Sequence, residues 1–160
     1  MKVKIFTAGG TIDKVYFDAK SDYLIGESNI GEILIEANVD VEHEAEAILR
    51  KDSLDMTDDD RQLVFDKISN DANELILVTH GTDTMVETAK KLQGISGKTI
   101  VLTGSMAPAR FRVSDAIFNI GFAFAAVQTL AHGVYIAMNG KIFRPDKVKK
   151  NRRKNRFEEK

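Results

Sequence analysis

Three short apolar runs, each ending in a glycine turn, constrain the fold more than any other feature of this sequence. The runs and their turns are Val3 to Thr7 before Gly9-Gly10-Thr11, Leu75 to Thr79 before Gly81-Thr82-Asp83, and Thr99 to Leu102 before Gly104-Ser105. Strands that are apolar on both faces are typical of a parallel sheet covered by helices on both sides. Val134 to Met138 supplies a further buried strand of this kind.

Helical patterns separate these runs, as parallel strands require. The sequence predicts helices over 57–69, 82–92 and 113–131, the first with an acidic first turn at Asp58-Asp59-Asp60. A strand over 41–49 has glutamates on one face and is predicted at a solvent-facing edge. We therefore predict one domain of the α/β class, with a doubly wound, mostly parallel sheet and helices on both faces.

Length and composition agree with a single globular unit. The chain has 160 residues, 43% of them hydrophobic and 29% charged, which is enough for one buried core. The absence of cysteine excludes disulfides and thiolate chemistry. Polar residues such as Arg112 and Asp115 interrupt the apolar stretch 111–130, which therefore predicts a packed helix and no membrane partner. The first residues do not resemble an export signal, and we expect a cytoplasmic protein.

The positive charge of the chain is concentrated at its end. Residues 141–160 hold 10 basic and 3 acidic residues, whereas the whole chain has a net charge of −1. We divide the chain into a domain over 1–144 and a basic segment over 145–160 that carries Lys150, and we expect weak structure after Arg144. A solvated terminus is favoured over a nucleic-acid partner, because no aromatic stacking platform accompanies the charges.

The glycine turns are also the place to look for chemistry. Ligands of open parallel sheets bind beyond the carboxyl ends of the strands, where all three turns would converge. The first turn lacks the spacing and lysine of a phosphate cradle. Its Thr11 hydroxyl is a candidate nucleophile, although a plain turn explains it better when it is taken alone.

A threonine nucleophile needs a neighbour that accepts its proton. Thr82 and Asp83 could pair with a lysine, of which Lys150 is one of several candidates, but N-capping of the next helix explains both as well. Ser53 and Asp55 could bind the two charged ends of an amino acid, and helix capping explains Asp55 equally well. His80 is interpreted as a hydrogen-bonded core residue, and the spacing of the histidines does not resemble that of a zinc site.

At these residues the sequence resembles the bacterial-type asparaginases and glutaminases. The resemblance rests on Thr7-Ala8-Gly9-Gly10-Thr11-Ile12 and on Val78-Thr79-His80-Gly81-Thr82-Asp83-Thr84, the second being highly specific. It continues through Asp52-Ser53-Leu54-Asp55-Met56-Thr57, Leu102-Thr103-Gly104-Ser105-Met106 and Met138-Asn139-Gly140, and ends near Lys150. It therefore covers almost the whole chain.

The resemblance implies hydrolysis of L-asparagine to aspartate and ammonia without a cofactor or metal, in a homo-oligomer. It implies a catalytic set of Thr11 as nucleophile, Tyr23 on a mobile lid, and the cluster of Thr82, Asp83 and Lys150. The substrate-binding residues that it implies are Gly10, Ser53, Asp55, Gly81 and Ser105. Ser53 would receive the substrate carboxylate, Asp83 would also anchor the ammonium, and Ser105 would place a backbone carbonyl near the amide.

Two departures from the family pattern leave other functions open. Full-length members carry a second α/β domain that completes a neighbour's pocket, and Leu54 stands where they usually place a polar side chain. One alternative is a binding or regulatory module with little turnover. Another is an amidase that acts on a related β-amide or on aminoacyl-tRNA. The preference between asparagine and glutamine also stays open, because one methylene is worth only about 1–3 kcal/mol of discrimination.

Overall fold

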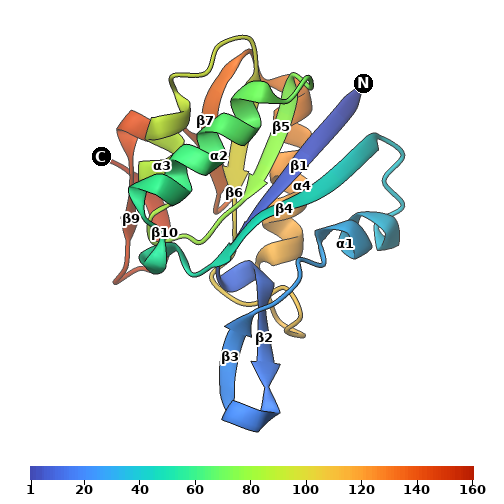
Figure 1. Cartoon of the computed structure of the whole chain (residues 1–160), viewed down its shortest axis with the longest axis vertical. Helices are drawn as coiled ribbons and strands as arrows, with labels where there is room; N and C mark the ends of the chain where they lie inside the picture. Colours follow the sequence, from blue (N-terminus) through green and yellow to red (C-terminus); the bar gives the residue numbers. More distant parts are fainter.

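The computed structural model describes residues 1–160 and is built on one six-stranded sheet (Figure 1). The strands of the sheet are β1 (Lys2–Gly9), β4 (Glu42–Lys51), β5 (Leu75–Thr79), β6 (Thr99–Thr103), β7 (Gly133–Met138) and β8 (Lys141–Phe143). Their order is β4-β1-β5-β6-β7-β8. All neighbouring pairs are parallel except β7 and β8, which are antiparallel.

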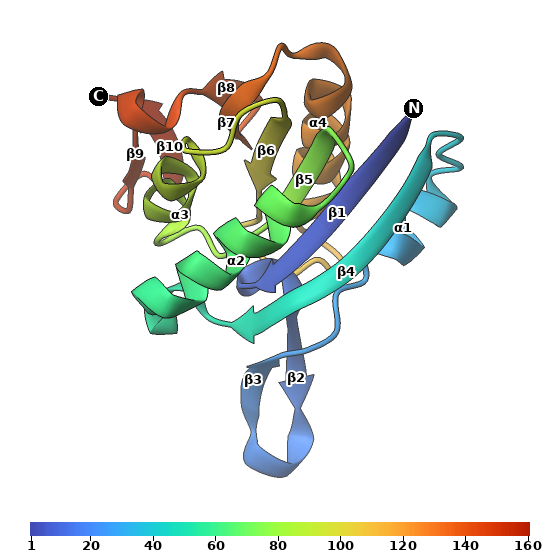
Figure 2. The same ribbon diagram turned by 45° about the horizontal axis from the view of Figure 1, so that its top comes forward.

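Helices cover both faces of this sheet (Figure 2). α2 (Asp58–Asn70) and α3 (Met85–Leu92) pack on one face, and α1 (Ile30–Glu36) and α4 (Ala116–Thr129) pack on the other. The strands supply both cores because successive side chains point to opposite faces. Phe6 and Val78 join the core under α2 and α3, whereas Ile5 and Leu77 join the core under α1 and α4. The predicted doubly wound α/β fold is confirmed.

The predicted edge strand is also confirmed, since β4 is the outermost strand of the sheet. Its glutamates pair with lysines of the neighbouring strand and helix. The Nζ of Lys4, which is only 5% exposed, lies 2.8 Å from an oxygen of Glu44 and 2.9 Å from an oxygen of Glu46. These pairs lower the pKa of Glu44 to about 2, mainly through hydrogen bonds from Lys2 and Lys4.

An antiparallel hairpin that the sequence patterns did not predict projects from the carboxyl edge of the sheet (Figures 1 and 2). It consists of β2 (Lys14–Phe17) and β3 (Asp22–Ile25), joined by the short 3-10 helix η2 (Asp18–Lys20). A second short helix, η1 (Thr11–Asp13), connects β1 to this hairpin. The hairpin side chains are mostly exposed, so the strands leave little hydrophobic pattern in the sequence. The short helix α1 was not predicted either.

Two helices begin later than predicted because tertiary hydrogen bonds hold the residues before them. α3 begins at Met85 instead of Thr82, since Thr84 donates its backbone N–H and its hydroxyl to Ser53. α4 begins at Ala116 instead of Val113, since the Asp115 carboxylate accepts the backbone N–H groups of Met106 and Ala107. The predicted helix over 57–69 agrees with α2, whose N-cap Thr57 forms a capping box with Asp60.

The expectation of weak structure after Arg144 is wrong. The segment forms the 3-10 helix η4 (Pro145–Lys147) and an antiparallel hairpin of β9 (Val148–Asn151) and β10 (Arg156–Glu159). Val148 and Phe157 are buried in the core beside α3, at 0% and 2% exposure. Two apolar residues thus anchor a segment whose composition is otherwise that of a solvated tail.

This anchoring can be tested by removing the Phe157 ring. Phe157→Ala is expected to lower the free energy of unfolding by about 3–5 kcal/mol, because truncation of a buried phenylalanine leaves a cavity. The exposed Arg153→Ala in the same hairpin should change it by no more than about 0.5 kcal/mol. Denaturant unfolding of the two variants makes the comparison. Equal, small effects would mean that the hairpin does not pack on the core.

Candidate functional site

Three turns meet at the carboxyl edge of the sheet, and their backbones are in direct contact. A Cβ atom placed on Gly10 would lie 2.3 Å from the Gly81 Cα, and one placed on Gly81 would lie 2.6 Å from the Ser53 Cβ. Side chains at these glycines would therefore collide with backbone or with Ser53. The turns after β1, β4 and β5 thus open onto the same edge. The sequence predicts this convergence for the turns after β1 and β5, but not for the turn after β4.

Thr11 is presented at this edge by glycine conformations that other residues rarely adopt. The chain leaves β1 through Gly9 and Gly10, with φ angles of 88° and 91°. Thr11 then begins η1 and is partly buried. A sharp exit from the strand thus places Thr11 directly after Gly10, the residue that contacts the turn after β5.

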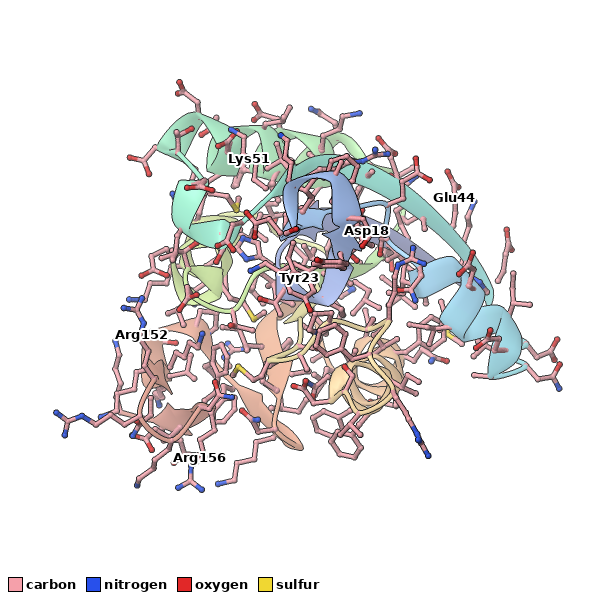
Figure 3. The ribbon with its side chains drawn as sticks, turned by 90° about the horizontal axis from the view of Figure 1, so that it is seen from below. Asp18, Tyr23, Glu44, Lys51, Arg152 and Arg156 are labelled. Atoms are coloured by element: carbon pink, nitrogen blue, oxygen red, sulfur yellow. The ribbon has the colours of Figure 1, made fainter.

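Thr11 and Tyr23 line one cavity of about 370 Å³. The other residues of this cavity are Lys14, Asp22, Pro108 and Phe111. Tyr23 comes from β3, and its ring lies 5.5 Å from that of Tyr16 and 5.9 Å from that of Phe111, between centroids. Seen toward the carboxyl edge, Tyr23 lies near the centre of the view (Figure 3). The projecting hairpin therefore delivers its tyrosine to the same cavity as the candidate nucleophile.

Lys150 joins Thr82 and Asp83 into a second group of polar side chains. Its Nζ lies 2.7 Å from the Thr82 Oγ1 and 2.9 Å from the Asp83 Oδ1. Neither Thr82 nor Asp83 caps α3, whose N-cap residue Thr84 has no side-chain cap hydrogen bond. The capping interpretation of these two residues is therefore wrong, and their polar groups face Lys150. Of the candidate lysines, β9 brings Lys150 to this turn.

A second cation that the sequence analysis missed also contacts this cluster. The Nε of Arg152 lies 3.3 Å from the Asp83 Oδ1, the same oxygen that Lys150 contacts. Arg152 lies just beyond β9, in the turn that joins it to β10, so no strand pattern in the sequence places it beside Lys150. Figure 3 shows Arg152 and Arg156 together at one corner of the molecule, away from Glu44.

Ser53 lies deep beside the glycine turns. It is 1% exposed, and its Oγ accepts the Thr84 N–H at 3.3 Å. The hydroxyl hydrogen remains available, because a serine accepts and donates at once. Asp55 is exposed in the 3-10 helix η3 (Ser53–Asp55) and does not cap α2, since Thr57 and Asp60 form that cap. The capping interpretation of Asp55 is therefore wrong as well.

The Ser105 hydroxyl is engaged by a carbonyl of its own loop and is not free to bind a ligand. Its hydroxyl donates to the carbonyl of Ala107, and the residue is 1% exposed. The preceding Gly104 has its carbonyl bound by the Asn119 side chain at 3.0 Å. A Cβ on Gly104 would lie 2.3 Å from the His80 carbonyl oxygen, so this third turn also packs against the turn after β5.

No group of three or more His, Cys, Asp or Glu side chains is arranged to hold a metal ion. His80 is completely buried with both ring nitrogens within hydrogen-bond distance of a partner, as predicted for a core histidine. Burial is the main reason that the pKa of His80 falls to about 4. The reaction without metal or cofactor stays a prediction.

Asp13 is a buried carboxylic acid that the sequence analysis did not single out. It lies two residues after Thr11, is 3% exposed, and its Oδ1 has no hydrogen-bond partner. Its backbone carbonyl accepts the Gly26 N–H at 2.8 Å, which closes the base of the β2–β3 hairpin. Burial raises the pKa of Asp13 to about 6, against the opposing influence of Ser28 and Arg110.

Comparison with known proteins shows the family and the fold of the chain. The family model described as "Asparaginase, N-terminal" matches residues 2–158. The chain belongs to the asparaginase family. Its fold is also similar to that of the thermostable L-asparaginase from Thermococcus kodakarensis, with a TM-score of 0.85 and 27% identity over 99% of this chain and 51% of that one.

Two curated relatives resemble the chain over most of its length. L-asparaginase 2 of Escherichia coli is 32% identical over 152 residues, covering 86% of this chain and 42% of the relative. The probable periplasmic L-asparaginase of Haemophilus influenzae is 31% identical over 156 residues, covering 88% and 43%. The chain thus spans less than half the length of these relatives. Since one relative is named as periplasmic, the cytoplasmic location stays a prediction.

The buried acid at the base of the hairpin gives a test of the site's electrostatics. Because the folded-state pKa of Asp13 lies above its ordinary value of 3.8, its ionisation costs stability as the pH rises from about 4 through 6. Asp13→Asn is expected to raise the free energy of unfolding at pH 8 by roughly 1–3 kcal/mol and to change it little at pH 4. Unfolding curves over this pH range measure the difference.

The matched control is Asp18→Asn, which alters an exposed aspartate in the same hairpin. It should leave the pH profile of stability as in the unaltered protein. A constant offset between Asp13→Asn and the unaltered protein from pH 4 to pH 8 would contradict the assigned burial.

Proposed function

We propose that this chain hydrolyses the side-chain amide of L-asparagine to L-aspartate and ammonia, with Thr11 as the nucleophile. The observation that carries the proposal is the contact between the Gly10 and Gly81 turns. It brings the Thr11 hydroxyl and the cluster of Thr82, Asp83 and Lys150 to one edge of the sheet. The family of the chain supports the same chemistry.

In this reaction the Thr11 Oγ attacks the amide carbon and forms an ester with the aspartyl group, while the carbon–nitrogen bond breaks. The hydroxyl proton passes through the polar groups of the site to the departing nitrogen, which leaves as ammonia. Water then cleaves the ester, takes the place of the nitrogen and restores the Thr11 hydroxyl. The hydrogen-bonded chain from Asp83 through Lys150 to Thr82 is suited to a proton-relay role.

The same turns supply groups for both ends of the amino acid. The Ser53 hydroxyl can donate a hydrogen bond to the substrate carboxylate, and the Asp83 carboxylate can accept a hydrogen bond from the substrate ammonium group. Gly10 packs against Gly81 and Gly81 packs against Ser53, so the absence of side chains at these glycines keeps the groups of the three turns close together. Tyr23 on the hairpin would close over the bound amino acid together with Phe111, which lines the same cavity. Asp55 and Ser105 complete the proposed binding set.

The nucleophile can be tested by ammonia release. The unaltered protein should release ammonia from L-asparagine, and Thr11→Ala should lower kcat by more than about a hundredfold because the attacking oxygen is gone. Thr11→Ser keeps a hydroxyl and should retain measurable turnover. Equal rates for Thr11→Ala and the unaltered protein would remove Thr11 from the mechanism.

Calorimetry with L-aspartate separates this function from that of a binding module. One-to-one binding in a protein that releases no ammonia would favour a regulatory or binding role for the same pocket. The absence of both binding and turnover would contradict both functions.

We also propose that the chain assembles as a homo-oligomer through α4. This helix contains no charged residue, and it leaves Ile117 and Phe118 at 60% and 62% exposure on its outer side. The Phe118 ring is stacked on that of Phe122. A second copy would bring an equivalent apolar face, as a two-fold interface requires.

No helix of the fold has the length and apolar character needed to cross a membrane.

The double variant Ile117→Glu with Phe118→Glu is expected to reduce the mass in solution to that of a monomer, because the new carboxylates would be buried in the interface. Light scattering after size-exclusion chromatography measures the mass. Ile35→Glu changes a residue that is 74% exposed on α1 and should leave the mass unaltered. A monomeric unaltered protein would contradict the assembly.

A further inference from the structure

His80 connects the candidate site to the core through hydrogen bonds from both of its ring nitrogens. It follows β5 directly and is 0% exposed. Its Nδ1 lies 2.7 Å from the Gly81 carbonyl oxygen, and its Nε2 lies 2.8 Å from the Thr88 Oγ1. The ring therefore links the glycine turn that precedes Thr82 to the middle of α3.

The partners of the ring determine which nitrogen carries the hydrogen. A carbonyl oxygen can only accept, so the Nδ1 must be the donor to Gly81. The Nε2 of the neutral ring then accepts the hydrogen of the Thr88 hydroxyl. The Gly81 carbonyl thus selects the tautomer, and the Thr88 hydroxyl, which can donate or accept, adapts to it.

This hydrogen bond fixes the orientation of the peptide between Gly81 and Thr82. In a trans peptide the carbonyl and the following N–H point in opposite directions. A Gly81 carbonyl held toward the ring therefore directs the Thr82 N–H away from the core. That N–H has no backbone acceptor within the chain.

The backbone of His80 is held equally firmly on its other side. Its N–H donates to the Thr103 carbonyl at 2.9 Å, and its carbonyl oxygen packs against Gly104. Gly81 itself has no side chain to restrict its conformation. The His80 ring therefore adds a directional hydrogen bond to a turn whose position the contacts of Gly81 with Gly10 and Ser53 already confine.

We propose that His80 is a positioning residue, whose Nδ1–H holds the Gly81 carbonyl so that Thr82 and Asp83 meet Lys150. The inference rests on the proposed function for its effect on turnover. The histidine acts through the turn and does not contact the substrate. If His80 served only the stability of the fold, loss of either ring nitrogen would have the same effect on kcat.

Two substitutions separate the ring nitrogens. His80→Asn keeps an N–H donor close to the position of the Nδ1 and is expected to retain kcat for ammonia release within about tenfold. His80→Gln places its polar end near the position of the Nε2 and leaves Gly81 without a donor, so kcat should fall by about a hundredfold or more. Thr88→Val leaves the Nε2 without a partner but keeps the Nδ1–H bond to Gly81, so it should lower kcat less than His80→Gln does.

Thr79→Val is the matched control, because the buried Thr79 hydroxyl has no hydrogen-bond partner and lies next to His80 in the chain. It should leave kcat unchanged. Equal losses in His80→Asn and His80→Gln, at equal thermal stability, would reduce His80 to a structural role and overturn the proposal.

Nitrogen NMR tests the same claim without turnover. The unaltered protein should show a protonated Nδ1 and an unprotonated Nε2 in His80, and the Thr82 amide signal should shift in His80→Gln more than in His80→Asn. The opposite tautomer overturns the proposal even in an active enzyme. Should the protein release no ammonia, the asparaginase function fails while these signals still decide the role of His80. Should both His80 variants fail to fold, the ring signals of the unaltered protein and of Thr88→Val decide.

Discussion

Close backbone contact between the first two glycine turns is the constraint on which the rest of the site depends. With a Cβ on Gly10 only 2.3 Å from the Gly81 Cα, any side chain there would force the turns apart. Separation of the turns would move the Thr11 hydroxyl away from Thr82 and Asp83. The two glycines therefore matter less for their flexibility than for their lack of side chains, which allows the two turns to lie in contact.

The second constraint is the route by which Lys150 reaches this edge. Lys150 lies in β9, which is antiparallel to β10 and outside the central sheet. The burial of Val148 and Phe157 holds this hairpin against the core beside α3. Hydrophobic packing of two side chains thus places a cation 68 residues away in sequence against the Thr82 hydroxyl.

The sequence predicted those parts of the fold in which local pattern and tertiary environment agree. The strands β1, β5, β6 and β7 are buried on both faces, so a continuous apolar run identifies them. The β2–β3 hairpin is exposed, and its order depends on contacts such as Tyr23 on Phe111. The composition of the C-terminal hairpin is typical of a solvated tail, because Val148 and Phe157 are its only buried apolar anchors among many charges. The starts of α3 and α4 depend on Ser53 and Asp115, whose bonds no local pattern reveals.

The site shows the same division between pattern and geometry. The three turns could be placed at one edge from the topology of a parallel sheet. The roles of Thr11, Tyr23 and Lys150 came from the resemblance, and composition alone left plain turns and helix caps as alternatives. The structure removes the cap alternatives for Thr82, Asp83 and Asp55, because Thr84 and Thr57 occupy the N-cap positions. The burial of Asp13 could not be predicted from the sequence, because it depends on the β2–β3 hairpin, which was not predicted.

The arrangement around Asp83 supports its proposed double role. Lys150 and Arg152 both contact its Oδ1, at 2.9 and 3.3 Å. Lys150 also donates to the Thr82 hydroxyl at 2.7 Å, so one lysine joins the carboxylate to the hydroxyl of the preceding residue. The Asp83 side chain is 28% exposed, whereas that of Lys150 is 14% exposed, so an ammonium group can reach the carboxylate from solvent. This exposure, together with the link to Lys150, favours a carboxylate that both joins the polar cluster and meets the substrate.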